Sequence, residues 1–189
     1  MRVTGGIWAS RRLRGPSKKQ KIRPTPDAMR ERAFAVIGAV VDGAVVLDLF
    51  SGSGAVGIEA LSRGAARVVF VDAHHSSTTL IRGNLDSLEA PDGAARVIQR
   101  PAMRAVGELA RSREVFDLVW ADPPFESWRD GLDALAAAVS GGLVSEAAVL
   151  CLECPASAPV ESLLPERLEI ARDLKGGASR VVMLRIAGA

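Results

Sequence analysis

Short runs of hydrophobic residues alternate along most of the chain with longer stretches in which apolar residues recur every three or four positions. The runs are typical of buried strands, and the longer stretches are typical of amphipathic helices. The alternation begins after Asp42-Gly43 and predicts strands over residues 44–50, 66–72, 95–99, 115–122 and 147–154. Helices are expected over residues 55–62, 76–88, 102–111 and 132–139. Strands that alternate with helices indicate right-handed crossovers, and therefore an α/β fold with a mostly parallel sheet.

The two ends of the chain depart from this pattern. Two final apolar runs, residues 168–171 and 181–186, have no helix of standard length between them and predict an antiparallel hairpin at the sheet edge. Residues 2–14 predict a β-hairpin with a bend at Gly5-Gly6 or Ala9-Ser10. Thr25-Pro26 then opens a helix, because threonine is a suitable N-cap and proline suits the first helical position. We therefore divide the chain into an extension, residues 1–42, and an α/β domain, residues 43–189.

Length and composition restrict the class of protein. With 189 residues, 48% of them hydrophobic, the chain can form one domain with a sizeable core and is too apolar for a disordered protein. It has no uninterrupted apolar run of about 18 residues, and its first residues lack the apolar run of a signal peptide. Two cysteines are too few for a disulfide framework. We expect a cytosolic monomer that does not enter a membrane.

The formal net charge of +2 conceals an uneven distribution of charge. Residues 1–24 contain no acid, and the rest of the chain carries a net charge of −6. A basic segment on an acidic body favours contact with the phosphates of RNA, although a solvated tail would have the same composition. Ile7, Trp8 and Leu13 lie among these charges as apolar anchors and indicate a folded element. The basic residues are Arg2, Arg11, Arg12, Arg14, Lys18, Lys19, Lys21 and Arg23.

A glycine-rich loop follows the first predicted strand. Gly52, Gly54 and Gly57 match the pattern G-x-G-x-x-G, and Asp72 lies at a suitable distance for a contact with a ribose, which together would indicate a dinucleotide. Asp48 argues against this reading, because two unit charges roughly 4–6 Å apart in a partly buried cleft repel by a few kcal/mol. The pyrophosphate of a dinucleotide would therefore be disfavoured beside Asp48.

S-adenosylmethionine suits the same loop better, because it carries a sulfonium and an ammonium group and only one carboxylate. In this interpretation Asp48 orients the cationic methionine part, and the glycines let the backbone approach the cofactor closely. Asp72 can accept hydrogen bonds from both ribose hydroxyls through its two oxygens. The alternative is that Asp48 is a helix-capping or loop residue without a ligand.

A second motif, Asp122-Pro123-Pro124-Phe125, follows the fourth predicted strand directly. Its prolines fix the backbone and have no N–H, so the loop presents acceptors only. A carboxylate oxygen and a neighbouring carbonyl can then accept both hydrogens of an exocyclic amine and aim its lone pair at a methyl donor. Phe125 offers an apolar face on which an extruded base can stack. Because ligands bind at the carboxyl ends of parallel strands, where Asp48, Asp72 and Asp122 are all expected, the two motifs belong to one site.

The order D-L-F-S-G-S-G and then D-P-P-F resembles class I methyltransferases that modify exocyclic amines. The N-terminal motifs Gly5-Gly6-x-Trp8, Arg11-Arg12-Leu13, Arg23-Pro24-Thr25 and Arg30-Glu31 make the chain similar to the RsmD-type 16S ribosomal RNA guanine-N2 methyltransferases. E-A-L-S-R-G-A at residues 59–65 and Lys175-Gly176 extend this resemblance over essentially the whole chain.

The resemblance implies a seven-strand class I methyltransferase sheet with an N-terminal hairpin and helix that help to hold RNA. It also implies methyl transfer from S-adenosylmethionine to the N2 amine of a guanine, at the site that the family modifies in 16S RNA or in an assembling small subunit. The implied catalytic residues are Asp122, Pro123, Pro124 and Phe125. The implied cofactor-binding residues are Asp48, Phe50, Ser51, Gly52, Ser53, Gly54, Asp72, Ala73, Ala102 and Thr25.

The chain departs from the family pattern at two places. Asp72 stands where we expect glutamate in most relatives, which shortens the reach towards the ribose. Many class I enzymes have an acid after the third strand that contacts the adenine amine, but residues 99–102, Q-R-P-A, contain none. We therefore expect backbone groups near Ala102 to recognise the adenine.

Two other features are assigned no role in chemistry. Cys151 and Cys154 lie in a predicted buried strand with no second pair, so we expect core packing and no metal site. His74-His75 is expected to be an exposed loop pair. No general base is evident, and the proton of the amine can leave to water or through Asp122.

Three other functions remain open at this point. A DNA adenine-N6 methyltransferase could use the same Asp122 loop, although 189 residues leave little room for a target-recognition region. An NAD-dependent oxidoreductase is disfavoured by Asp48. A non-catalytic RNA-binding assembly factor could keep the fold as a scaffold, but both site motifs are intact.

Overall fold

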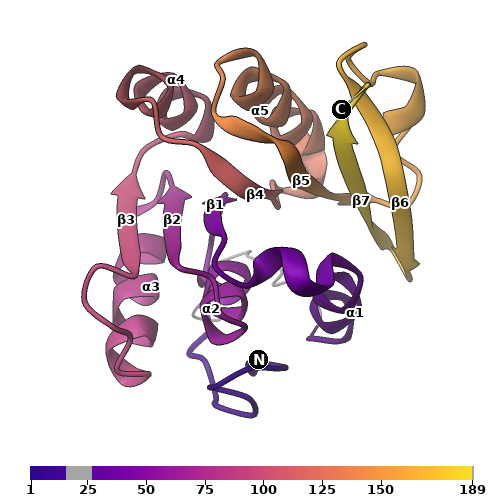
Figure 1. Ribbon diagram of the computed structural model, residues 1–189. Helices are drawn as coiled ribbons and strands as arrows, with labels where there is room; N and C mark the ends of the chain where they lie inside the picture. Colours follow the sequence, from indigo (N-terminus) through magenta and orange to yellow (C-terminus); the bar gives the residue numbers. More distant parts are fainter. Residues whose placement is uncertain (16–26, 189) are drawn as a thin grey trace.

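The computed structural model describes residues 1–15 and 27–188 (Figure 1). Its centre is a seven-stranded sheet with the order β3-β2-β1-β4-β5-β7-β6. The strands are β1 (Val45–Leu49), β2 (Arg67–Asp72), β3 (Ala95–Gln99), β4 (Phe116–Ala121), β5 (Val144–Pro155), β6 (Leu168–Gly176) and β7 (Ser179–Ile186). The pairs among β1 to β5 are parallel, whereas β7 runs antiparallel to both β5 and β6. The predicted α/β fold with a closing antiparallel hairpin is confirmed.

Five helices cover the two faces of this sheet: α1 (Asp27–Ile37), α2 (Ala55–Ser62), α3 (His75–Ser87), α4 (Ala102–Ser112) and α5 (Trp128–Ser140). Figure 1 shows α1, α2 and α3 on one face and α4 and α5 on the other. Alternate strand residues supply the two cores, because successive side chains of a strand point to opposite faces. Val46, Phe70 and Trp120 pack under the first group of helices, and Leu47, Val69 and Val119 under the second. Within the described residues, no helix is long and apolar enough to span a bilayer.

Most predicted elements are found close to their expected bounds, and α2 and β3 coincide with them. The helix predicted over residues 132–139 begins earlier, at Trp128. Its first turn, W-R-D-G, has no apolar periodicity, and Gly131 obscured the helix in the sequence. This glycine is needed for close packing, because a Cβ there would lie 2.7 Å from Leu152 Cδ1 and 2.8 Å from Pro123 Cγ. Thr25 and Pro26, predicted to open α1, lie outside the described residues.

The predicted N-terminal hairpin is found, but it is short and irregular. Arg2 and Arg12 form an antiparallel bridge, and the amides of Val3 and Leu13 donate to the carbonyls of Arg11 and Met1 at 3.0 and 3.2 Å. Residues between them form consecutive turns, in which Gly6 and Ser10 have positive φ angles of 78° and 68°. Side-chain packing also holds the segment, because Val3, Trp8 and Leu13 are buried in the same core as α1, α2 and α3. The expectation of a folded element is confirmed for the anchors Trp8 and Leu13, but it is wrong for Ile7, which is 77% exposed, and Val3 is the third buried residue instead.

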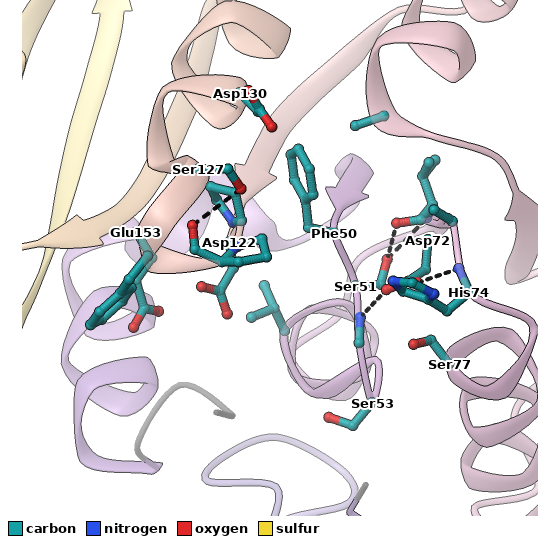
Figure 2. A pocket seen from close by; sticks show the side chains of 18 of the residues that line it. Phe50, Ser51, Ser53, Asp72, His74, Ser77, Asp122, Ser127, Asp130 and Glu153 are labelled. Carbon is teal, nitrogen blue, oxygen red and sulfur yellow. Dashed lines mark hydrogen bonds between the residues drawn. The ribbon is translucent and has the colours of Figure 1, made fainter. Parts of the chain in front are cut away.

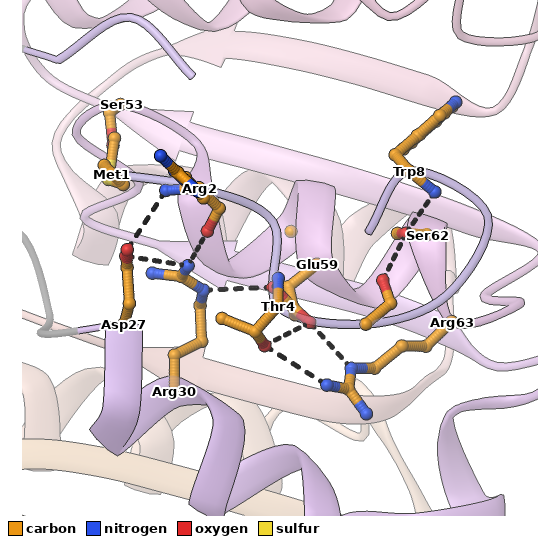
Figure 3. Close-up of polar contacts among 12 residues, drawn as sticks. Met1, Arg2, Thr4, Trp8, Asp27, Arg30, Ser53, Glu59, Ser62 and Arg63 are labelled. Atoms are coloured by element: carbon orange, nitrogen blue, oxygen red, sulfur yellow. Dashed lines mark hydrogen bonds and ion pairs between the residues drawn. The ribbon is translucent and has the colours of Figure 1, made fainter. Parts of the chain in front are cut away.

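A buried polar cluster joins this segment to α1 and α2 (Figure 3). We call Thr4, Arg30, Glu59, Ser62 and Arg63 the docking network. The Glu59 carboxylate lies 3.2 Å from Arg30 Nε and 2.8 Å from Arg63 Nε, and it accepts hydrogen bonds of 2.8 and 2.7 Å from the Thr4 amide and hydroxyl. Ser62 Oγ accepts a 2.9 Å hydrogen bond from the Trp8 amide and donates to the Gly5 carbonyl at 2.6 Å. Several residues of the N-terminal motifs therefore hold the chain together.

Candidate active site

A cavity of about 990 Å³ lies at the carboxyl ends of the parallel strands (Figure 2). The loops after β1, β2, β3 and β4 form its walls, and β5 and the turn between β6 and β7 close one end. It brings together most of the site residues predicted from the sequence, from both motifs. These are Phe50, Ser51, Gly52, Ser53, Asp72, Ala73, Ala102, Asp122, Pro123, Pro124 and Phe125.

The glycine-rich loop between β1 and α2 has an unusual backbone. Phe50, Gly52 and Gly54 all have positive φ angles, of 59°, 54° and 78°. For a non-glycine residue such as Phe50 this conformation costs on the order of 1–3 kcal/mol, so the surrounding contacts must impose it. Ser51 supplies them: its amide donates to the Val71 carbonyl at 3.0 Å, its hydroxyl donates to the Asp48 carbonyl at 2.6 Å, and the same hydroxyl accepts the Val71 amide at 2.9 Å. The loop is thus fastened to β2 with its backbone facing the cavity.

Asp72 ends β2 and holds the loops on either side of it. Its Oδ2 accepts the Gly52 amide at 2.9 Å, and its Oδ1 accepts the His74 amide at 2.8 Å. The carboxylate is 8% exposed and lines the cavity. Since a carboxylate has about four lone-pair directions, each oxygen keeps one for a ligand hydroxyl. This arrangement fits the contact with two ribose hydroxyls that the sequence predicts, and that contact stays a prediction.

Asp48 lies beneath the glycine-rich loop and does not line the cavity. Its side chain is 1% exposed, and its Oδ2 accepts the Gly57 amide at 3.0 Å. Burial, together with the charge of Asp72, raises the pKa of Asp48 to about 7, against the opposing effect of the Gly57 hydrogen bond. The predicted contact with a methionine moiety therefore has no direct path in this arrangement. An influence of its charge through the loop stays a prediction.

The Asp122 loop leaves β4 opposite the glycine-rich loop. The Asp122 amide donates to the Leu49 carbonyl at 3.3 Å, which ties the start of the loop to the end of β1. Pro123 is buried against Gly131 of α5, Pro124 is exposed, and the Ser127 amide closes the turn on the Pro124 carbonyl at 2.9 Å. Phe125 is half-buried in the cavity wall and keeps an accessible face. The loop is therefore a rigid platform that presents acceptors and one aromatic ring.

Glu153 is a cavity residue that the sequence analysis missed. It lies on β5, is 3% exposed and lines the cavity next to Asp122. A signal was present in the sequence, because Glu153 is an acid inside the apolar run A-A-V-L-C-L-E-C, where an unpaired charge is costly. Ser77, Met103 and Asp130 also line the cavity and were not singled out.

The two cysteines and the two histidines that were assigned no role in chemistry lie where the sequence predicts them. Cys151 and Cys154 are buried in β5, and burial raises the pKa of both thiols. His74 is exposed at the cavity rim, and His75 is exposed at the start of α3. Among the described residues, no group of three or more His, Cys, Asp or Glu side chains is arranged to hold a metal ion.

The predicted RNA-binding residues fall into two sets. Arg2, Arg11, Arg12 and Arg14 are exposed on the N-terminal segment. That segment is linked to the glycine-rich loop through Asn84, which donates to the carbonyls of both Arg14 and Ser53, at 3.1 and 3.0 Å. Outside the described residues lie Lys18, Lys19, Lys21 and Arg23, together with the predicted cofactor residue Thr25.

Comparisons with known proteins agree with this arrangement. The sequence profile of the family described as Conserved hypothetical protein 95 (Cons_hypoth95) matches residues 1–185. Over 125 residues the chain is 38% identical to Ribosomal RNA small subunit methyltransferase D of Escherichia coli K12, an alignment that spans 66% of this chain and 60% of that relative.

Two solved structures are similar over most of their length. The Escherichia coli protein yhhF has a TM-score of 0.83 and 27% identity, covering 100% of this chain and 99% of that one. A conserved hypothetical protein of Streptococcus pyogenes has a TM-score of 0.73 and 30% identity, covering 84% of this chain and 96% of that one. The fold is therefore shared with both, and the similarity to the Escherichia coli protein extends over the N-terminal segment.

Proposed function

Because this chain belongs to the Cons_hypoth95 family, the RsmD-type methyltransferases, we propose that it transfers a methyl group from S-adenosylmethionine to the N2 amine of a guanine in 16S ribosomal RNA. The observation that carries the proposal is that a single cavity is lined both by the glycine-rich loop with Asp72 and by the Asp122 loop. One motif suits a nucleoside cofactor and the other suits a planar amine. The name of the Escherichia coli relative supports ribosomal RNA as the substrate.

The residues at the Asp72 end of the cavity fit S-adenosylmethionine. Asp72 keeps lone pairs for the ribose hydroxyls, and the loop of Ser51, Gly52 and Ser53 lets the backbone approach the ligand. Ala102 and Met103 at the start of α4 offer an apolar surface for the adenine, and no acid follows β3. S-adenosylmethionine supplies an electrophilic methyl group and leaves as a neutral thioether.

The residues at the Asp122 end fit the acceptor amine. The Asp122 carboxylate and the neighbouring carbonyl of the loop accept the two hydrogens of N2, which holds the nitrogen and aims its lone pair towards the cofactor end. Phe125 stacks on the extruded base. After the nitrogen–carbon bond has formed, one proton leaves the nitrogen through Asp122 or directly to water.

The RNA lies across the N-terminal segment in this proposal. The exposed Arg2, Arg11, Arg12 and Arg14 contact its phosphates, and the chain acts as a cytosolic monomer on 16S RNA or on an assembling small subunit. An NAD-dependent oxidoreductase is disfavoured because Asp122 and Glu153 both line the cavity and would repel a pyrophosphate.

The test is to identify the methylated nucleoside. The full chain is incubated with methyl-labelled S-adenosylmethionine and, in separate reactions, with unmodified 16S RNA, unmodified small subunits and duplex DNA, and the products are digested and analysed by mass spectrometry. We expect N2-methylguanosine from one or both ribosomal substrates. Label on the N6 amine of adenine in DNA would replace the proposal by a DNA methyltransferase, and RNA binding without label would replace it by an assembly factor.

A further inference from the structure

Glu153 is a buried acid whose side chain faces the cavity. Only 3% of its surface is exposed, although it is one of the residues that line the pocket. The neighbouring positions of β5, Leu152 and Cys154, both point into the core under α5. Because side chains alternate along a strand, Glu153 must point the other way, towards the cavity and the cofactor side.

The register of the sheet places Glu153 beside Asp122. Ala121 of β4 is the parallel partner of Leu152 of β5, so the next residue on each strand is Asp122 and Glu153. Neighbouring strands lie about 4.8 Å apart, which brings the two side chains within reach of one small ligand. Figure 2 shows both carboxyl groups directed into the same end of the pocket. Any planar amine that Asp122 holds therefore has Glu153 at its side.

The Watson–Crick edge of guanine matches two neighbouring acceptors. Guanine presents the N2 amine and, directly beside it, the N1–H, and both are donors. Adenine presents its N6 amine beside N1, which is an acceptor. A carboxylate next to the amine site would accept the N1–H of guanine, and it would face the lone pair of adenine N1 without a hydrogen between them.

We propose that Glu153 determines the specificity for guanine by accepting a hydrogen bond from N1–H while Asp122 holds N2. This inference rests on the proposed function, and it assigns to a residue of β5 the choice of base within the same cavity. Glu153 takes no part in the methyl transfer itself. A site built to bind a donor rejects an analogue that lacks it, because the buried acceptor is then left without its partner.

The test uses 2-aminopurine, a base that keeps the exocyclic 2-amine but has an unprotonated N1. The 16S RNA substrate that accepts methyl groups from the wild-type chain is rebuilt by ligation with either guanine or 2-aminopurine at the modified position. We expect the wild-type chain to methylate guanine at least about a hundredfold more efficiently than 2-aminopurine. The affinity for S-adenosylmethionine and the thermal unfolding of each variant are measured alongside.

Glu153→Gln is the informative variant. A glutamine amide can accept N1–H of guanine or, after rotation, donate to N1 of 2-aminopurine. The ratio of the two efficiencies should therefore fall at least about tenfold, mainly because 2-aminopurine becomes a better substrate. Glu146→Gln is the matched control, because it makes the same chemical change at an exposed position of the same strand and should leave the ratio unaltered.

Each other outcome contradicts the inference in a recognisable way. An equal loss of activity on both bases in Glu153→Gln would show that Glu153 only supports the fold. A weaker affinity for S-adenosylmethionine with an unchanged ratio would assign it to the cofactor. If the wild-type chain methylated no guanine in any substrate, the proposed function itself would fail, and this is distinguishable because it is seen before any variant is made.

Discussion

Two buried carboxylates on neighbouring elements, Glu59 of α2 and Asp48 of β1, have opposite surroundings. For Glu59, burial opposes ionisation, but hydrogen bonds from Thr4 and Arg63 and the charge of Arg30 outweigh it and lower the pKa. For Asp48, burial dominates: its carboxylate accepts the Gly57 amide, no described residue forms an ion pair with it, and its pKa rises to about 7. The same kind of group is thus saturated with positive charge in one place and short of it in the other.

This difference separates the parts of the molecule that hold the fold from those that await a ligand. In the docking network the charge of Glu59 is compensated within the chain, by two arginines and by the Thr4 donors. Asp48 lies under the loop where we propose that a cation binds, and a positive ligand would complete what the chain does not provide. We therefore take the compensated carboxylate, Glu59, as structural, and we expect the uncompensated one, Asp48 beneath the glycine-rich loop, to influence a ligand.

The largest expected effect concerns the docking network. Glu59→Ala should lower the free energy of unfolding by about 3 kcal/mol, because it removes the fully buried partner of Arg30 and the acceptor of both Thr4 hydrogen bonds, while Asp27 still lies 3.1 Å from Arg30 Nη2. Glu108→Ala removes an exposed pair with Arg100 on α4 and should cost less than about 1 kcal/mol. Denaturant unfolding of both variants checks this, and equal losses would mean that the docking network contributes no more than a surface ion pair.

In contrast to the docking network, a substitution in the cavity should lower the activity and leave the stability of the fold unchanged. Asp122→Ala should lower methyl transfer on the order of a hundredfold or more, the range for removing one key polar contact, while leaving S-adenosylmethionine binding and unfolding close to normal. Asp133→Ala on the exposed side of α5 is the control. Single-turnover assays and calorimetry measure these quantities, and near-normal turnover in Asp122→Ala would remove this residue from the proposed reaction.

The ionisation of Asp48 should make the stability of the fold depend on pH. Its pKa is about 7 in the folded chain against 3.8 in an unfolded one, so the folded state binds more protons between these values, and its contribution to stability is lost as pH rises from about 4 to 7. Asp48→Asn keeps an acceptor for Gly57 but cannot ionise. Relative to wild type, it should gain on the order of 3 kcal/mol between pH 4 and pH 8.

The same variant should bind S-adenosylmethionine more weakly, because the ionised carboxylate is the group that attracts the cation. An analogue without the ammonium group should be affected less. Stability curves at several pH values, together with calorimetry on both ligands, test the two halves. If Asp48→Asn gained stability and kept its full affinity, Asp48 would be a loop residue without a role towards the ligand.

Most of the fold could be predicted from the sequence, because apolar runs alternate clearly with amphipathic stretches. The N-terminal hairpin is found as predicted, but it is shorter and less regular than its alternation suggests, because Val3, Trp8 and Leu13 are core anchors around which the segment turns. The early start of α5 was not predicted, because Gly131 disfavours a helix. Glycine is required there by the close approach of Pro123, a contact that the local sequence does not reveal.

The sequence predicted most residues of the site, but not which of their side chains face the cavity and which are buried in the core. Both motifs meet in one cavity because the carboxyl ends of parallel strands share an edge. Whether a side chain there faces the cavity or the core depends on the packing of α2 over β1, which buries Asp48, and on the register of β4 and β5, which brings Glu153 beside Asp122. Neither relation is local in sequence.

The smallest effect is expected for the exposed arginines on the segment that the docking network holds. If Arg11, Arg12 and Arg14 each contact a phosphate, replacing all three by glutamine should flatten the log–log dependence of RNA affinity on salt by about two units, at about 0.7 per single-stranded contact. The fold should tolerate this change, because the Arg14 backbone keeps both hydrogen bonds to Asn84 and the anchors of the segment are apolar. Affinity for S-adenosylmethionine should barely change.

The matched control replaces Arg111, Arg113 and Arg167, which are exposed and do not line the cavity. A lower slope in the first triple variant alone would mean that the docking network exists to present these arginines to RNA. Equal slopes in both would mean that the docked segment serves the fold only, and that the RNA binds elsewhere.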